Sequence, residues 1–181
     1  ILSLYVTHDQ EEAMAISDRI ALFNAGRLIQ VGRPRDVYAQ PASLFAADFI
    51  GRANFFRARV VARGPDGAKL SLPGGTTLAV QRVVSLPADE VTRLPPGADG
   101  LVMARPEGIV IGQPHAGLPA RVRRVQHLGG FSRFILAAEA ATGEIAVDAW
   151  RAMDEFAEGA EVGLVLNPAD SVLFAGPRTA P

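Results

Sequence analysis

The chain has 181 residues, of which 49% are hydrophobic and 20% charged, and its 18 Lys+Arg against 19 Asp+Glu leave a net charge of −1. This composition is typical of a folded chain of one or two domains, and the near-zero charge disfavours a basic platform for nucleic acid. The sequence contains no cysteine, which excludes disulfides and cysteine nucleophiles. With no signal peptide and no apolar run near the ~18 residues of a membrane span, it predicts a cytoplasmic protein.

The first part of the chain, residues 1–53, alternates strand-like and helix-like patterns. Residues 1–6 form a continuous apolar run, which is typical of a strand buried on both faces inside a parallel sheet. Because such a strand needs neighbours and no initiator methionine precedes it, we expect the chain to be the C-terminal piece of a longer protein. Asp9 is then expected to cap a helix over 10–16, with Glu12 completing a capping box.

The remainder of this part is predicted as a hairpin followed by two short helices. Residues 19–23 and 27–31 are strand-like and are separated by a turn that ends at Gly26. Pro34 suits the first turn of a helix that runs to about residue 39. A second helix over 44–50 is expected to be capped by Ser43 and terminated by Gly51.

From Asn54 onward the pattern changes to short β-like runs at about ten-residue spacing, divided by glycine and proline. This pattern predicts a mainly β fold, a small barrel or sandwich, in which Trp150 and Phe156 pack rather than bind a ligand. Residues 58–61 and 120–123 echo each other, which indicates two copies of a small barrel unit, approximately 55–112 and 118–176. The strand-like runs are 56–62, 69–72, 77–81, 100–104, 120–125, 131–137, 144–148 and 161–166.

Residues 5–14, Tyr-Val-Thr-His-Asp-Gln-Glu-Glu-Ala-Met, resemble the switch-histidine segment of the ATP-binding subunits of ABC (ATP-binding-cassette) solute importers. Further matching stretches follow in the order and spacing of that family, and the later ones resemble its regulatory C-terminal TOBE domain. The resemblance implies a partial α/β remnant of the ATPase domain over 1–53 and a TOBE-type regulatory domain over 54–181. The latter would consist of two interlocked OB-like β-barrel repeats. The later stretches lie at 17–21, 26–32, 34–38, 49–51, 54–56, 104–107 and 162–174.

His8 is the candidate catalytic residue. It follows the apolar run and precedes a helix N-terminus, a position where α/β proteins bind ligands and where amide groups favour phosphate. A neutral imidazole can donate a hydrogen bond to a γ-phosphate and accept one from the attacking water. Position alone favours an exposed histidine at a strand end, but the resemblance assigns His8 the role of the switch histidine, which senses the γ-phosphate.

Other parts that phosphoryl transfer requires are not found in this sequence. The reaction needs a P-loop lysine and side chains that hold Mg²⁺, whereas Lys69 is the single lysine and follows Ala68, outside any P-loop motif. Residues 70–75 mimic the signature segment of the family, but Pro73 interrupts them and predicts a β-turn. We therefore expect ATP and Mg²⁺ to act in the intact transport ATPase, and neither to bind this chain alone, which should be inactive without P-loop, signature and Walker B segments.

The remaining polar candidates receive structural interpretations. We expect a bend that links the two barrel repeats at Arg105, Pro106 and Glu107. A contact between Arg105 and an anion is the alternative. His115 and His127 lie in turns, and with no cysteine nearby we expect neither to ligate a metal.

The resemblance implies the cytoplasmic ATPase subunit of a bacterial importer, peripheral on the inner face of the plasma membrane. Its partners would be a second copy of itself, the transmembrane permease subunits and, indirectly, a periplasmic solute-binding protein, but no nucleic acid. The junction at 51–55 favours iron(III), polyamine or phosphonate as substrate, with sugars as the alternative.

The rival hypothesis is a stand-alone regulatory TOBE module that binds a small ligand. An oligonucleotide-binding protein is disfavoured because the sequence lacks a basic groove with interleaved aromatic residues.

Overall fold

The computed structural model describes residues 2–85, 95–150 and 156–175, and it divides into two compact units. The first extends to Gly51 and the second starts at Arg52, two residues before the division expected from the sequence. Each unit has its own hydrophobic cluster of buried residues.

The first unit lacks the opening strand that the sequence predicts. Residues 2–7 are in no strand, and the side chains of Leu2, Leu4 and Val6 are exposed. The physical reason is that no strand in the described part of this unit lies beside them to bury their apolar side chains and pair their backbone. The only sheet described here is the hairpin of β1 (Ile20–Asn24) and β2 (Arg27–Gly32), which pair antiparallel.

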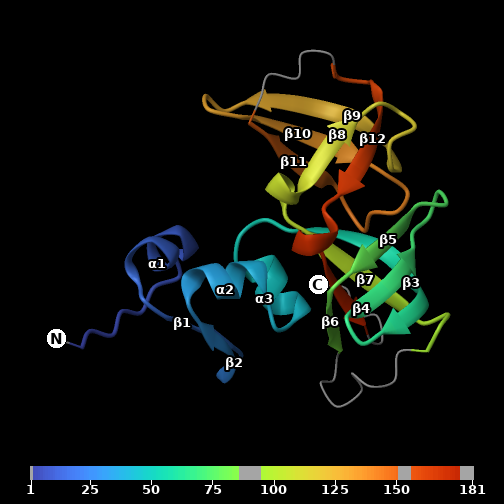
Figure 1. Ribbon diagram of the computed structural model, residues 1–181. Helices are drawn as coiled ribbons and strands as arrows, with labels where there is room; N and C mark the ends of the chain where they lie inside the picture. Colours follow the sequence, from blue (N-terminus) through green and yellow to red (C-terminus); the bar gives the residue numbers. More distant parts are fainter. Residues whose placement is uncertain (1, 86–94, 151–155, 176–181) are drawn as a thin grey trace. The chain divides into compact units, whose positions relative to one another are not determined.

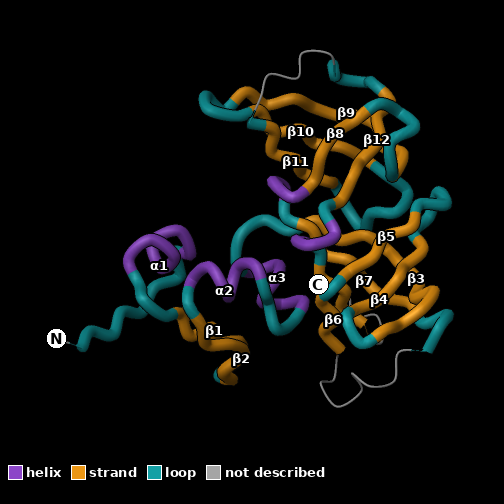
Figure 2. Tube along the Cα trace, in the orientation of Figure 1, coloured by secondary structure: helices purple, strands orange, loops and turns teal. Residues whose placement is uncertain are grey.

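Three short helices complete this unit and begin at the predicted residues (Figure 2). They are α1 (Gln10–Ile16), α2 (Pro34–Ala39) and α3 (Leu44–Phe49). Ser43 caps α3 by accepting a hydrogen bond from the Ala46 amide, and Gly51 then takes a φ of +72°. A side chain is disfavoured at that position, because a Cβ on Gly51 would lie 2.7 Å from a ring carbon of Tyr38. The core of the unit is formed by Leu22, Val37, Ala46 and Ile50.

The second unit is built from two sheets and confirms the mainly β, barrel-like prediction (Figure 1). One sheet has the strand order β5-β4-β3-β7-β13-β6 and the other has the order β11-β10-β9-β12-β8. The first sheet consists of β3 (Asn54–Gly64), β4 (Gly67–Ser71), β5 (Thr77–Val80), β6 (Arg82–Ser85), β7 (Asp99–Ala104) and β13 (Val172–Ala175). The second consists of β8 (Ile109–Gly112), β9 (Leu118–His127), β10 (Ser132–Ala137), β11 (Ile145–Ala149) and β12 (Glu161–Leu166).

The two sheets exchange one strand each. Strand β8 belongs to the first half of the unit but pairs with β12, whereas β13 ends the second half and lies between β7 and β6. The chain crosses over through two short 3₁₀ helices, η2 (Pro106–Gly108) and η3 (Pro168–Asp170). Repeats drawn as the continuous segments 55–112 and 118–176 therefore do not correspond to separate sheets.

A second link between the sheets is made by hydrogen bonds at the start of β3. The Asn54 side chain is 2% exposed; its Nδ2 donates to the Ala146 carbonyl (2.8 Å) and its Oδ1 accepts from the Ala146 amide (2.7 Å). The Arg57 amide donates to the carbonyl of Ala140 (2.7 Å), and the Thr142 amide donates to the carbonyl of Phe55 (3.0 Å). These hydrogen bonds, of which those between Asn54 and Ala146 are buried, fix β3 to β11 and to the loop before it.

Strands β6, β8 and β13 were not among the eight predicted runs. Each has four residues, and β13 is a wholly buried apolar run whose sequence shows no alternation. The predicted turn after β4 is confirmed: Pro73 and Gly74 join β4 to β5, and Gly74 and Gly75 both have positive φ.

Candidate functional sites

The first candidate site is the segment that carries His8. His8 lies immediately before the N-cap of α1, and its side chain is exposed. Asp9 caps the helix, since its Oδ1 accepts a hydrogen bond from the Glu12 amide at 3.0 Å. Gln10, the first residue of α1, connects this helix to the segment after α3, because its Oε1 accepts a hydrogen bond from the Gly51 amide at 2.9 Å.

Side chains on both sides of His8 hold this segment in a defined shape. The Glu12 carboxylate accepts hydrogen bonds from the Tyr5 hydroxyl (3.0 Å) and the Thr7 hydroxyl (3.1 Å), and Thr7 Oγ1 accepts the Asp9 amide (3.0 Å). The expected capping box is thus only half formed, because the Asp9 amide donates its hydrogen bond to Thr7 Oγ1 and not to the Glu12 side chain. The hydrogen bond to Glu12 raises the pKa of Tyr5, since the nearby carboxylate disfavours a phenolate.

The arrangement presents an imidazole to solvent at a fixed place beside a helix start. An imidazole in this position can donate one hydrogen bond to an anionic ligand and accept another from water. This capacity is what the predicted contact of His8 with a phosphate requires.

The bend formed by Arg105, Pro106 and Glu107 lies where β7 leads through η2 into β8. Arg105 is 4% exposed, and its Nη1 donates to the carbonyl of Arg52 at 3.0 Å. The guanidinium is therefore engaged with the backbone inside the unit, which argues against the anion contact that the sequence left open for Arg105.

The second candidate site is a pocket of about 330 Å³ in the second sheet. A β-bulge creates it: the register between β9 and β10 shifts so that Ile135 faces Arg124 while Leu136 faces Val122. The extra residue, Arg123, reverses the alternation of side chains along β9. As a result Val125 and His127 lie on the same face as their cross-strand partners Phe134 and Ser132.

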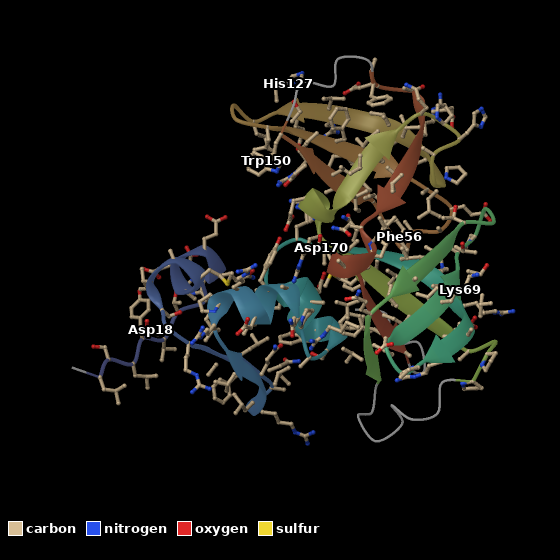
Figure 3. All side chains as sticks on the ribbon, in the orientation of Figure 1. Asp18, Phe56, Lys69, His127, Trp150 and Asp170 are labelled. Carbon is tan, nitrogen blue, oxygen red and sulfur yellow. The ribbon has the colours of Figure 1, made fainter. Side chains whose placement is uncertain are left out.

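Polar groups and phenyl rings both line this pocket. His127 Nδ1 and Ser132 Oγ are 3.0 Å apart, and Glu158 Oε1 accepts a hydrogen bond from the Val125 amide at 3.2 Å. Phe134 and Phe156 are buried and form its apolar part. The sequence predicts only a turn at His127 and only packing for Phe156, because the bulge that brings these residues together has no local sequence signal. Figure 3 labels His127 at the end of β9.

The neighbouring charged residue on β10 is directed elsewhere. Arg133 forms a bidentate ion pair with Asp148 of β11, with both N–O distances at 2.7 Å, and this hydrogen-bonded pairing raises the pKa of Arg133. Trp150 contacts Phe131, with ring centroids 5.0 Å apart, yet it is 68% exposed. Trp150 therefore packs on Phe131 at the rim of the sheet, directly after β11, and not in the buried core.

Within residues 2–85, 95–150 and 156–175, no three histidine or acidic side chains gather in a way that would hold a metal ion. Across the same ranges, no helix is long and apolar enough to cross a membrane.

Comparison with known proteins finds a TOBE domain within the second unit. Residues 102–174 match the TOBE domain family, and this match and the relatives below confirm the resemblance to ATP-binding subunits of ABC importers. The chain is 43% identical over 137 residues to the sulfate/thiosulfate import ATP-binding protein CysA 1 of Chromobacterium violaceum, covering 75% of this chain and 34% of the relative.

Two further relatives point to the same class of protein. The chain is 36% identical over 129 residues to the spermidine/putrescine import ATP-binding protein PotA of Mesorhizobium japonicum, covering 71% of this chain and 33% of the relative. It is 36% identical over 141 residues to the Fe(3+) ions import ATP-binding protein FbpC of Agrobacterium fabrum, covering 77% and 37%. The chain thus spans about a third of the length of these relatives.

A solved structure shares the β fold. The cytoplasmic molybdate-binding protein ModG, in a form with molybdate bound, superposes with a TM-score of 0.51 at 18% identity, covering 68% of this chain and 96% of that protein. At this identity the likeness concerns the fold alone.

Proposed function

We propose that this chain is the C-terminal portion of the cytoplasmic ATP-hydrolysing subunit of a bacterial ABC importer, located on the inner face of the membrane. The observation that carries the proposal is the order of its two parts. An exposed histidine at the start of a capped helix is followed by a TOBE unit, and import ATP-binding proteins match more than two thirds of the chain.

In this function His8 senses the γ-phosphate of ATP and helps to position the attacking water. Tyr5, Thr7 and Glu12 hold the segment so that the imidazole keeps its place while the rest of the nucleotide site, with its Mg²⁺, is supplied by other segments. Arg105, Pro106 and Glu107 act as a structural motif of the regulatory domain.

The proposed substrate is iron(III), a polyamine or a phosphonate. Among the relatives above, one imports Fe(3+) ions and another spermidine and putrescine, by their names, while the third imports sulfate and thiosulfate. The partners in the complex are permease subunits and a periplasmic solute-binding protein.

Titration with Mg-ATP tests the assignment of the nucleotide site. We expect this chain to bind Mg-ATP weakly at best and to release no phosphate, because a lone histidine cannot replace a lysine and several amide donors around the phosphates. Isothermal titration calorimetry and a phosphate-release assay measure both properties, and the product of the longer gene should bind in the micromolar range. Micromolar binding by the 181-residue chain itself would refute the proposal.

We also propose that the chain forms a homodimer. Leu2, Leu4 and Val6 are exposed, and burying such side chains contributes ~1.5–3 kcal/mol each, which is comparable with the entropic cost of association. Sedimentation of the full chain beside a chain that starts at Arg52 is the measurement. If both chains are dimers, the contact lies in the TOBE unit; if only the full chain is a dimer, the contact lies in the first unit. If both chains are monomers, the prediction is wrong.

A second candidate function is a regulatory TOBE module that binds a small ligand without an ATPase role. Two observations favour it: the pocket lined by β9, β10 and residues 156–158, and the fold shared with the molybdate-binding protein ModG. Sequencing upstream of the gene separates the two functions, since the importer subunit requires a P-loop there.

A further inference from the structure

The geometry of the pocket points to a ligand-binding site for a small organic cation, an ammonium group on an apolar body. The site is formed by His127, Ser132, Phe134, Phe156 and Glu158. It is separate from the His8 segment and does not depend on the proposed transport function.

Size and lining indicate a small molecule rather than a macromolecule. The volume of about 330 Å³ is near the lower end of the ~300–1,000 Å³ that is usual for small-molecule sites. The apolar lining that a ligand can reach is provided by Val125 and Ala157, beside the buried rings of Phe134 and Phe156, while the polar groups belong to His127, Ser132 and Glu158. Pockets with this combination bind a ligand by its apolar body and orient it by a few polar contacts.

The charge of the lining selects a cation. Glu158 is the single acidic side chain among the described lining residues, and neither lysine nor arginine is among them. The three arginines of this part of β9 and β10 lie elsewhere: Arg133 is paired with Asp148, Arg124 is opposite Ile135, and Arg123 is the exposed bulge residue. An oxyanion would meet a carboxylate that no lysine or arginine among the described lining residues offsets, whereas an ammonium group gains a charge-assisted hydrogen bond.

Hydrogen bonds within the site prepare this selectivity. The Val125 amide donates a hydrogen bond to Glu158 Oε1 at 3.2 Å, which positions the carboxylate at the pocket. The other carboxylate oxygen can then accept a hydrogen bond from a ligand. His127 and Ser132 hold each other at 3.0 Å, so their remaining lone pairs and protons are presented in fixed positions. Fixed side chains lose little conformational entropy when a ligand binds.

Three probes of similar shape test the inference on the full 181-residue chain: benzylammonium, benzyl alcohol and benzoate. Binding is followed by NMR, using the amide signals of Val125 and Ser132. We expect saturable shifts with benzylammonium, and about tenfold weaker binding of benzyl alcohol and of benzoate, corresponding to ~1.4 kcal/mol. Benzoate binding as tightly as benzylammonium, or no saturable shift at these two amides with benzylammonium, would overturn the proposal.

A pair of variants identifies the group responsible. Glu158→Gln keeps an oxygen for the Val125 amide but removes the charge, and we expect it to weaken benzylammonium binding about tenfold. Glu144→Gln is the matched control, since Glu144 is exposed in the loop before β11 and does not line the pocket; its affinity should equal that of the unmodified chain. Unchanged affinity in Glu158→Gln, or an equal loss in both variants, would refute the role of Glu158. None of these results depends on ATP turnover.

Discussion

Replacing His8 with alanine in the longer ATP-hydrolysing protein is expected to lower turnover by about 10²–10⁴-fold, with little change in nucleotide affinity. The imidazole would stabilise charge on the transferred phosphoryl group and position water, and both interactions are strongest in the transition state. The side chain is exposed and lies outside the core of its unit, so its loss should leave the fold intact. Steady-state ATPase kinetics together with equilibrium nucleotide binding measure the two effects.

His115→Ala is the matched control for this experiment. His115 is also exposed, but it lies in the turn between β8 and β9 of the TOBE unit, so turnover should remain within about twofold of the unmodified protein. If His8→Ala instead weakens nucleotide binding while turnover at saturation is preserved, His8 is a ground-state binding residue and the proposed role is wrong.

Gly163→Ala is expected to destabilise the TOBE unit by about 3 kcal/mol or more and to lower its melting temperature by roughly 10 °C. Gly163 lies in β12 between Gly112 of β8 and Pro119 of β9. A Cβ at this position would lie 2.0 Å from the Ala116 carbonyl oxygen and 2.6 Å from the Gln113 carbonyl oxygen. These are backbone atoms of a turn closed by the Ala116–Gln113 hydrogen bond, so they cannot move aside without breaking the turn.

Gly143→Ala provides the comparison. Gly143 lies in the loop between β10 and β11, and a Cβ there would meet nothing within 4 Å. The same change of one methyl group should therefore alter stability by no more than ~0.5 kcal/mol. Thermal denaturation followed by circular dichroism measures both variants; equal melting temperatures would show that the turn over β12 is more compliant than the structure indicates.

Local elements were predictable where a local signal exists. Asp9, Pro34 and Ser43 each carry a capping or first-turn preference, and the three helices begin where these residues predict. Alternating strands such as β4 and β5 were predictable for the same reason. The prediction of an opening strand was wrong, because an apolar run becomes a strand only when other strands bury its side chains and pair its backbone.

The candidate sites divide in the same way. His8 was predictable from its neighbours in the sequence, and the structure places it at the helix start that those neighbours define. The pocket residues are up to 33 positions apart, as in the Val125–Glu158 hydrogen bond, and they meet because Arg123 adds one residue to β9. Nothing in the local pattern at Arg123 distinguishes a bulge from continued alternation, so the pocket could be found only from the structure.

The exchange of β8 and β13 bears on how this chain folds during its synthesis. Domains usually fold on the ribosome as soon as their own residues have emerged. Here the sheet that begins at Asn54 is not complete until Val172–Ala175 has emerged, because β13 lies between β7 and β6. The nascent chain must therefore hold some 120 residues without a finished first sheet, and a stop codon placed shortly before residue 172 would remove a central strand from the sheet that was translated first.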